Sequence, residues 1–249
     1  MYTLTELMIV TAAREIQDRE VVFVGMRLPM KAFTLAKRLH APNAVGFFES
    51  GVVRDRPVNQ SLVTMADTAN IVGAAWAGGM SLLMGLLAQG YVHLGLLGGA
   101  QIDRYGNLNT SYIGDYVTPQ VRLPGSGGAC DIASLAQRTV LIMPHEARRF
   151  VEEVDYITSP GHGTGIGWRE GVGLPKRNGF RAYGGPDKVI TTLGIFGIDD
   201  EGEMVLEQIH PGHSLDDVSE QTGWDLLVDE ELRETAPPTK EELKVLRGL

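Results

Sequence analysis

The sequence predicts a single α/β domain over residues 1–249, with an open, mainly parallel sheet flanked by helices. Two observations favour this fold. Stretches with apolar residues at helical spacing alternate with short, continuous apolar runs of the kind that parallel sheets bury. The length of 249 residues suits one large domain, and no sharp change of composition marks an internal boundary.

Helices and strands alternate through the first half of the chain. The elements expected there are, in order, a helix over 5–18, a strand over 20–24, a helix over 29–40, a strand over 44–48, a helix over 73–89 and a strand over 91–97. Thr3 and Glu6 have the spacing of a capping box before the first helix, and Pro29 suits the first turn of the second. The third helix is inferred from a run of small and apolar residues that would pack closely.

The second half of the chain contains more loop. The elements expected there are, in order, a loop over 101–109, a helix over 131–137, a strand over 139–143, a short helix or turn over 146–154, a loop over 159–185 (alone or with short strands), strands over 188–198 and 204–209, and helices over 214–221 and 239–247. Residues 199–202 would join the last two strands as a hairpin. Ser214 caps one helix, and Thr239 with Glu242 caps the other, which lies in a C-terminal tail over 236–249.

Composition narrows the classes of function. The formal charge of -9 makes nucleic acid an unlikely partner, because phosphate binding needs a basic face. Cys130 is the single cysteine, which excludes an internal disulfide and suits a reducing compartment. The N-terminus lacks the pattern of a signal peptide, and the apolar stretch over 71–87 is too rich in glycine for a membrane span. We therefore expect a cytoplasmic protein with no membrane partner.

Glu49 is the first candidate for chemistry. It follows the strand expected over 44–48, and open α/β sheets place their sites at the carboxyl ends of strands. Apolar neighbours on both sides would desolvate its carboxylate, which makes a carboxylate a better nucleophile. The following Gly51 would let a substrate approach the backbone. The alternative is a glutamate that faces solvent at an ordinary turn.

The second candidate is the glycine-rich loop over 125–128. A loop of this kind at the start of a helix presents unpaired backbone N–H groups, which bind an anion or an oxyanion that forms during a reaction. It lacks the Lys-Ser/Thr of a P-loop, and Cys130 breaks the dinucleotide-binding pattern. The alternative is an ordinary turn. Cys130 would be a nucleophile if the helix N-terminus lowers the pKa of its thiol, and the alternative is a small, buried hydrophobic residue.

Other polar residues offer weaker signals. Arg54 and Arg56 follow Glu49 closely and would suit a substrate carboxylate, since guanidinium groups bind carboxylates bidentately. The segment over 101–107 has the composition of a polar turn. The pair His210 and His213 lacks the spacing and the companion ligands of a zinc site, so no metal is expected.

Three motifs occur in order along the chain, and together they identify a family resemblance. They are Phe48-Glu49-Ser50-Gly51, then Gln101-Ile102-Asp103-Arg104-Tyr105-Gly106-Asn107, and then Pro124-Gly125-Ser126-Gly127-Gly128-Ala129. This set closely resembles the β subunit of family I CoA-transferases, particularly the glutaconate CoA-transferase branch. Ser50 stands where the commoner form of the first motif has asparagine. The resemblance extends over nearly the whole chain.

The resemblance implies a set of roles. Glu49 would be the catalytic residue, and the backbone N–H groups of Gly127 and Gly128 would stabilise the oxyanion. Contacts to substrate or CoA would come from Ser50, Gly51, Arg54, Gln101, Gly125 and Ser126. As in the family, the active site would lie between this chain and an α subunit. The α chain carries the glycine motif associated with CoA binding, and the absence of that motif here fits an isolated β subunit. Coenzyme A would be a substrate and a covalent intermediate, with no permanently bound cofactor.

The implied reaction moves CoA between a short, dicarboxylic acyl-CoA and a free carboxylate through a glutamyl-CoA thioester on Glu49. Three alternatives remain at this level. The same scaffold would also suit an acyl-CoA hydrolase, a C–C bond hydrolase or a decarboxylase. A non-catalytic partner subunit would need no functional Glu49. A sugar-phosphate-binding protein would use the glycine loop for phosphate.

Overall fold

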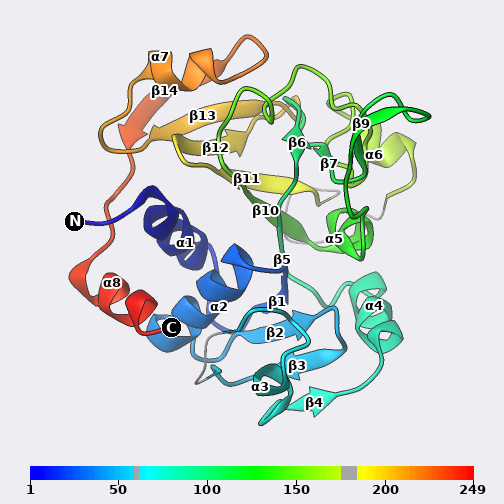
Figure 1. The fold of residues 1–249 in the computed structure, drawn as a ribbon, viewed down its shortest axis with the longest axis vertical. Helices are drawn as coiled ribbons and strands as arrows, with labels where there is room; N and C mark the ends of the chain where they lie inside the picture. The colour runs from blue at the N-terminus through cyan, green and yellow to red at the C-terminus, as the bar shows by residue number, and fades with distance from the viewer. Residues whose placement is uncertain (59–61, 175–183) are drawn as a thin grey trace.

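The computed structural model describes residues 1–58, 62–174 and 184–249, and within them ten strands form one sheet (Figure 1). These strands are β1 (Val21–Val24), β2 (Val45–Phe48), β3 (Val52–Arg54), β4 (Trp76–Ala77), β5 (Leu94–Leu97), β10 (Arg138–Ile142), β11 (Pro186–Ile190), β12 (Gly194–Ile198), β13 (Met204–Ile209) and β14 (Leu227–Glu234). Their spatial order is β14-β13-β12-β11-β10-β5-β1-β2-β3-β4.

The middle of the sheet is parallel, which confirms the predicted fold class. Strands β2, β1, β5, β10 and β11 pair in parallel, one after the other. On one side β3 and β4 continue the sheet in antiparallel pairing, and on the other β12 and β13 do so before a final parallel pairing with β14. The parallel section brings the carboxyl ends of β1, β2, β5 and β10 to one edge.

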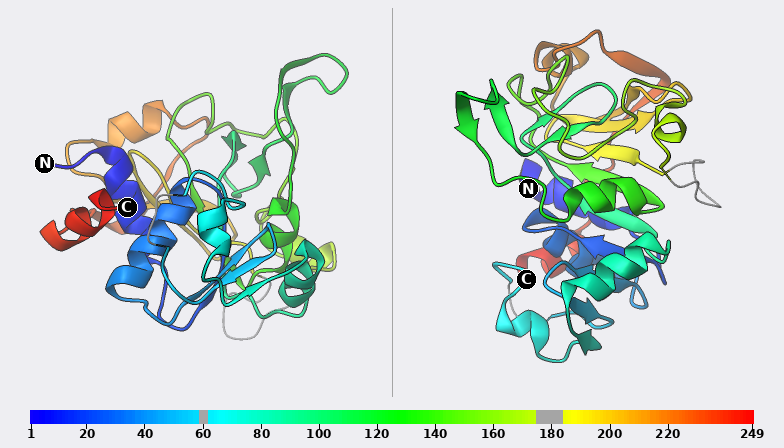
Figure 2. Two further views of the ribbon diagram at one scale, coloured as in Figure 1. Left: turned by 60° about the horizontal axis from the view of Figure 1, so that its bottom comes forward. Right: turned by 90° about the vertical axis from the view of Figure 1, so that its right-hand side faces the viewer.

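Helices cover both faces of the sheet (Figures 1 and 2). The helices are α1 (Leu4–Arg14), α2 (Leu28–Leu39), α3 (Thr68–Ile71), α4 (Met80–Ala88), α5 (Ala129–Leu135), α6 (Trp168–Gly171), α7 (Leu215–Glu220) and α8 (Lys240–Arg247). One buried cluster joins the sheet to α1, α2 and α8, and a second joins its other face to α4 and α5. Along β1, Val22 and Val24 enter the first cluster while Phe23 enters the second, as the two-residue period of a strand requires.

Two small hairpins stand apart from the main sheet in the described residues. They are β6 (Gln101–Ile102) with β7 (Leu108–Asn109), and β8 (Tyr112–Gly114) with β9 (Pro119–Arg122). The loop expected over 101–109 is therefore a short hairpin with a polar turn. In that part of the chain for which the structure is described, no helix is long and apolar enough to cross a membrane.

The helix ends follow the capping signals in the sequence. Capping boxes form between Thr3 and Glu6 at α1 and between Thr239 and Glu242 at α8, and Ser214 caps α7. The C-terminal helix packs on the body of the protein, since Arg14 donates a hydrogen bond of 2.8 Å to Glu242. The segment from residue 236 is thus held against α1.

The helix expected over 73–89 is wrong in its first half. Only Met80–Ala88 is helical, while Trp76–Ala77 forms the edge strand β4 beside β3. Gly78 and Gly79 explain the difference, because glycine disfavours a helix interior and Gly79 becomes the N-cap of α4. This adjacent pair of glycines was the sign of the break that the sequence offered.

The single strand expected over 188–198 is also wrong. The chain reverses at Thr191, whose hydroxyl accepts hydrogen bonds from the N–H groups of Leu193 and Gly194, and β11 and β12 pair in antiparallel. The hairpin expected over 199–202 is confirmed between β12 and β13. The segment over 146–154 forms turns, and within the predicted loop over 159–185 residues 175–183 lie outside the described structure.

His145 links the loop after β10 to the rest of the core. Its ring is 5% exposed, stacks on Phe150 with ring centroids 3.7 Å apart, and lies within hydrogen-bond distance of the Thr191 and Thr222 hydroxyls. Burial lowers the pKa of His145 to about 3. In the folded protein the His145 ring therefore stays neutral at pH values where the same ring in the unfolded protein is already protonated.

This difference predicts an acid-dependent loss of stability. The pKa of His145 is lower in the folded protein than in the unfolded one. Its contribution to the free energy of unfolding is therefore full above about pH 6.5 and falls as the pH drops toward 3. Between pH 7 and pH 5 the wild type should lose about 2 kcal/mol more unfolding free energy than His145→Phe. Urea unfolding at the two pH values measures this, and equal losses in both proteins would contradict it.

Candidate active site

Glu49 stands at the carboxyl end of β2, immediately after Phe48. The turn that follows is closed by a hydrogen bond of 2.8 Å from the Gly51 N–H to the Phe48 carbonyl oxygen. Gly51 has a φ of +91°, and a side chain there would collide with the carbonyl oxygen of Gly78. The turn that follows Glu49 at the edge of the sheet therefore requires glycine at position 51.

The glycine loop meets Glu49 directly. The Gly128 N–H donates a hydrogen bond of 2.8 Å to Oε1 of the Glu49 carboxylate. A Cβ placed on Gly127 would lie 3.1 Å from the same oxygen, and one on Gly128 would lie 3.3 Å from the Glu49 Cδ. Only glycine lets the backbone approach the carboxylate this closely. The two segments that the sequence singled out therefore form one site, although 79 positions separate Glu49 from Gly128.

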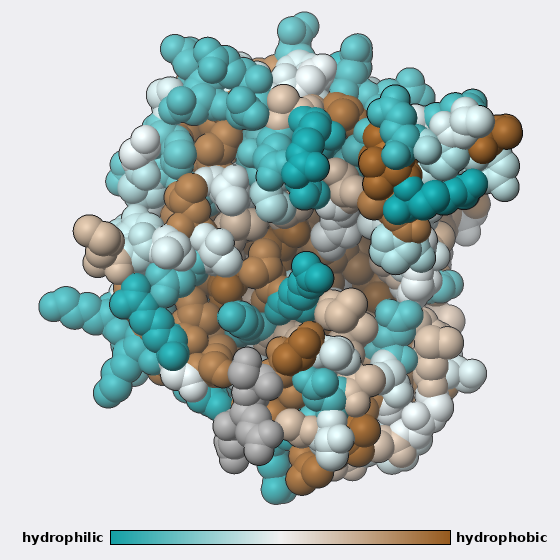
Figure 3. Space-filling model, viewed as in Figure 1, coloured by the Kyte–Doolittle hydropathy of each residue, from teal (hydrophilic) through white to brown (hydrophobic). Residues whose placement is uncertain are grey.

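A cavity of about 530 Å³ opens in front of the carboxylate. Its walls are the segments that follow the parallel strands, which are 25–29 after β1, Glu49 after β2, Gly98 and Gly99 after β5, and 143–144 after β10. The loop over 124–127 forms a further wall. This is the edge at which open α/β sheets bind their ligands. Figure 3 shows apolar side chains gathered in a hollow near the middle of the face seen in Figure 1.

The walls of this cavity are mostly apolar side chains and backbone. Phe23, Leu97, Ile132 and Met143 are among them. An apolar wall lowers the local dielectric, so charges and dipoles inside the cavity act more strongly than in water. A half-buried carboxylate held by a backbone N–H in such a place can act as a nucleophile toward an electrophilic carbonyl.

Comparison with known proteins places this geometry in a family. The family model described as coenzyme A transferase matches residues 5–221. The chain belongs to the coenzyme A transferase family. It is 39% identical to the B subunit of the 3-oxoadipate CoA-transferase of Pseudomonas knackmussii, over 100% of this chain and 93% of that protein.

Two further likenesses are to glutaconate CoA-transferase of Acidaminococcus fermentans. The B subunit of that enzyme is 38% identical, over 95% of this chain and 88% of that protein. The crystal structure of glutaconate coenzyme A-transferase superposes with a TM-score of 0.90 at 35% identity, covering 99% of this chain and 94% of the matched chain. The protein is thus the B subunit, or β chain, of a CoA-transferase, as the three sequence motifs predicted.

The structure separates the remaining predicted contact residues into two groups. Gly125 and Ser126 line the cavity of this CoA-transferase chain. Ser50 instead donates a hydrogen bond of 3.0 Å to the Met65 carbonyl oxygen, and Gly51 shapes the turn. Ser50 and Gly51 therefore help to hold the turn that follows Glu49.

Arg54 and Gln101 do not line the cavity. Arg54 is 4% exposed, and its guanidinium donates to the carbonyl oxygens of Asn70 and Val72 at 2.6 and 3.0 Å. These bonds anchor the segment between β3 and β4, so the expected role of Arg54 in holding a substrate carboxylate is not supported. Gln101 is also buried, and its amide bonds to Asp155 and Asn109.

Other residues at the cavity were not predicted from the sequence. Arg27, Gly98, Gly99 and Thr110 all line it. Arg27 and the two glycines closely follow strands that the sequence did predict, so the same rule that drew attention to Glu49 would have found them. The thiol of Cys130 has a pKa raised by burial and by Asp131, which argues against a role as nucleophile.

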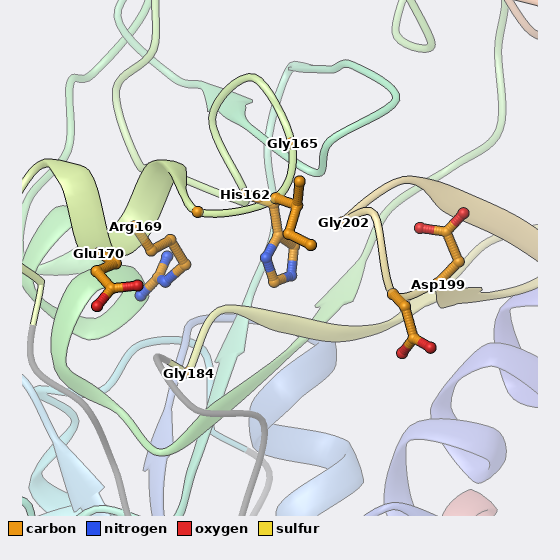
Figure 4. Close-up of a pocket in the computed structure, with 10 residues that line it drawn as sticks. His162, Gly165, Arg169, Glu170, Gly184, Asp199 and Gly202 are labelled. Carbon is orange, nitrogen blue, oxygen red and sulfur yellow. The ribbon is translucent and has the colours of Figure 1, made fainter.

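A second cavity of about 340 Å³ has a lining separate from that of the Glu49 cavity. Figure 4 shows His162 and Arg169 at this cavity, with Asp199 across from them. Arg169 donates to the carbonyl oxygens of Gly161 and Ala133, and the ring of His162 lies 3.0 Å from the Pro186 carbonyl oxygen. These contacts hold backbone segments together. Among the described residues, no His, Cys, Asp and Glu side chains gather in threes as metal ligands would.

The close approach of Gly128 to Glu49 predicts the effect of a single methyl group. In Gly128→Ala the new Cβ would press on the Glu49 carboxyl group and on the tip of Met84, which would move the carboxylate away from the N–H. Activity of the complex with its α subunit should fall about 10²-fold in kcat/KM, because small displacements of a reacting group are costly.

Gly85→Ala is the matched control for this variant. It makes the same change in α4 at a position with open space around it. Unchanged activity in Gly128→Ala, or an equal loss in both variants, would show that the contact with Glu49 has no part in the reaction.

Proposed function

We propose that this β chain transfers CoA from an acyl-CoA to a free carboxylate through a glutamyl-CoA thioester on Glu49. One observation carries the proposal, which is the hydrogen bond of 2.8 Å from the Gly128 N–H to the Glu49 carboxylate in a largely apolar cavity. The names of the relatives support the reaction type, and the geometry supports the residue.

The proposed reaction begins with nucleophilic attack. A carboxylate oxygen of Glu49 attacks the thioester carbonyl carbon of the donor, the C–S bond breaks, and CoA leaves as a thiolate. The product is a mixed anhydride between the acyl group and Glu49. The thiolate then attacks the Glu49 carbonyl carbon, and the donor acid leaves as a carboxylate. Glu49 now carries CoA as a thioester, and an acceptor carboxylate reverses these steps.

The glycine loop has a defined task in this sequence. When the thiolate attacks the Glu49 acyl carbon, negative charge develops on the Glu49 acyl oxygen. The Gly128 N–H already lies 2.8 Å from an oxygen of that carboxyl group. A donor fixed in advance needs no reorganisation as charge develops, which is the principle of an oxyanion hole. In our proposal the adjacent Gly127 N–H is the second donor.

Water must be kept from the thioester, because hydrolysis would waste its free energy. We propose that an α subunit covers the cavity and supplies the contacts to CoA, since both relatives described above are B subunits by name. Coenzyme A is then a substrate and a covalent intermediate, with no permanently bound cofactor. The cytoplasmic location stays a prediction, supported by the single cysteine.

We propose a short dicarboxylic acid as the acyl group. The two relatives are named for 3-oxoadipate and glutaconate, and both names denote dicarboxylates. A cavity of about 530 Å³ has room for a short acid beside the end of the CoA arm.

Replacement of Glu49 tests the role of its carboxylate. Glu49→Gln keeps the size and the acceptor oxygen for the Gly128 N–H but removes the nucleophile. Transfer should fall by at least about 10³-fold, while assembly with the α subunit is unchanged. Glu230→Gln, at an exposed position of β14, is the control and should keep full activity. Full activity in Glu49→Gln would contradict the proposal.

Intact mass spectrometry tests the intermediate itself. The complex is exposed briefly to glutaconyl-CoA or another short acyl-CoA without acceptor, and peptide mapping locates any adduct. We expect CoA on the Glu49 peptide of the wild type and none in Glu49→Gln. An assembled complex that consumes acyl-CoA without an adduct, and without need of an acceptor, would instead be a hydrolase.

A further inference from the structure

Arg27 brings a positive charge to the Glu49 cavity. It lies between the end of β1 and the start of α2, and it lines the same cavity as Glu49. Its side chain is exposed, and within the described residues its guanidinium has no hydrogen-bond or ion-pair partner. An arginine in this state offers a planar set of donors to an anion that enters the cavity.

Among the described residues that line the cavity, no other side chain has a positive charge with which to bind an anion. Among the described residues that line it, Arg27 is the one cation and Glu49 the one anion. The guanidinium of Arg54, which the sequence had favoured for a carboxylate, is already occupied by the carbonyl oxygens of Asn70 and Val72. An anionic ligand in this largely apolar space would therefore meet a single positive side chain.

The backbone at Arg27 adds a second observation. Its φ is 67° and its ψ is -108°, a conformation that glycine adopts readily and that strains other residues. Glycine would make the same turn at lower cost. A strained residue that persists at a cavity is a sign of function when its side chain reaches a ligand.

We infer that Arg27 binds the distal carboxylate of the dicarboxylic substrate and so sets the selectivity for dicarboxylic over monocarboxylic acids. The inference rests on the proposed transfer function, because it places the reacting end of the acid at Glu49. In this inference the other end of a short dicarboxylate lies in the same cavity, which the unpaired side chain of Arg27 also lines.

A phosphate of CoA is the other anion that Arg27 could receive. The carboxylate is favoured because the thiol of CoA reacts at Glu49, and the whole pantetheine arm separates this thiol from the phosphates. Since Arg27 lines the same cavity as Glu49, it is placed to bind the acyl group and not the phosphates. The two sources predict different substrate dependence, which an experiment can separate.

The test compares acceptors that differ only in the distal carboxylate. Steady-state kinetics are measured for the complex with its α subunit, using glutarate and pentanoate as acceptors and one donor that forms the Glu49 adduct. In Arg27→Gln, kcat/KM for glutarate should fall about 10- to 100-fold, mainly through KM, while the value for pentanoate changes little. Arg27→Lys should keep part of the preference, because it keeps the charge.

Arg27→Gly adds a readout of the strained backbone. It should lose the preference for glutarate and raise Tm by about 2–4 °C, because glycine relieves the strain. Arg19→Gly is the matched control, since Arg19 has a φ of 69° but does not line the cavity. It should keep wild-type selectivity.

Each other outcome overturns the inference. Equal losses for glutarate and pentanoate would assign Arg27 to CoA or to the fold, and no loss for glutarate would show that Arg27 does not bind the acid. A wild type without preference for glutarate would also contradict it. The proposed transfer function is tested separately, because the wild type would form no adduct on Glu49 if that function were wrong.

Discussion

The hydrogen bond from the Gly128 N–H to the Glu49 carboxylate is the contact on which the site depends. It joins the carboxyl end of β2 to the loop that opens α5, and each side needs glycine for it to form. Gly51 shapes the turn behind the glutamate, while Gly127 and Gly128 let the backbone approach its carboxyl group. In the proposed mechanism, the N–H that holds the carboxylate before reaction later stabilises charge on the Glu49 acyl oxygen.

The parallel middle of the sheet explains why these segments meet. Neighbouring parallel strands end at one edge, so the segments after β1, β2, β5 and β10 become walls of one cavity. A parallel sheet must be covered on both faces. Here α1 and α2 pack on one face through the first buried cluster, and α4 and α5 pack on the other face through the second. The ends of the parallel strands thus set the positions of Glu49 and Arg27.

Much of this fold, and the meeting of Glu49 with the glycine loop in the candidate site, agrees with the sequence predictions. Glu49 and the glycine loop were found because strand ends and glycine clusters have a direct physical meaning. The prediction for Arg54 failed because its closeness to Glu49 in sequence does not show which carbonyl oxygens its guanidinium contacts. Those of Asn70 and Val72 lie 16 and 18 positions further along the chain. Likewise the strand expected over 188–198 hid a reversal at Thr191, since β-branched residues suit both strands and the turn interrupts no apolar pattern. The edge strand β14 was missed because its sequence is mostly charged, as suits a strand with exposed sides.

The central claim is that the Glu49 carboxylate itself takes part in the transfer. In the proposed route an oxygen of the acceptor carboxylate stays on Glu49 when CoA leaves for the acceptor. Turnover with an ¹⁸O-labelled carboxylate acceptor, followed by mass analysis of the Glu49 peptide, follows that oxygen directly. With the labelled acceptor, we expect ¹⁸O in the Glu49 side chain. In a second experiment in which only the water is labelled, we expect no ¹⁸O in the released acid. Transfer without label on Glu49, or released acid that takes its oxygen from labelled water, would contradict it.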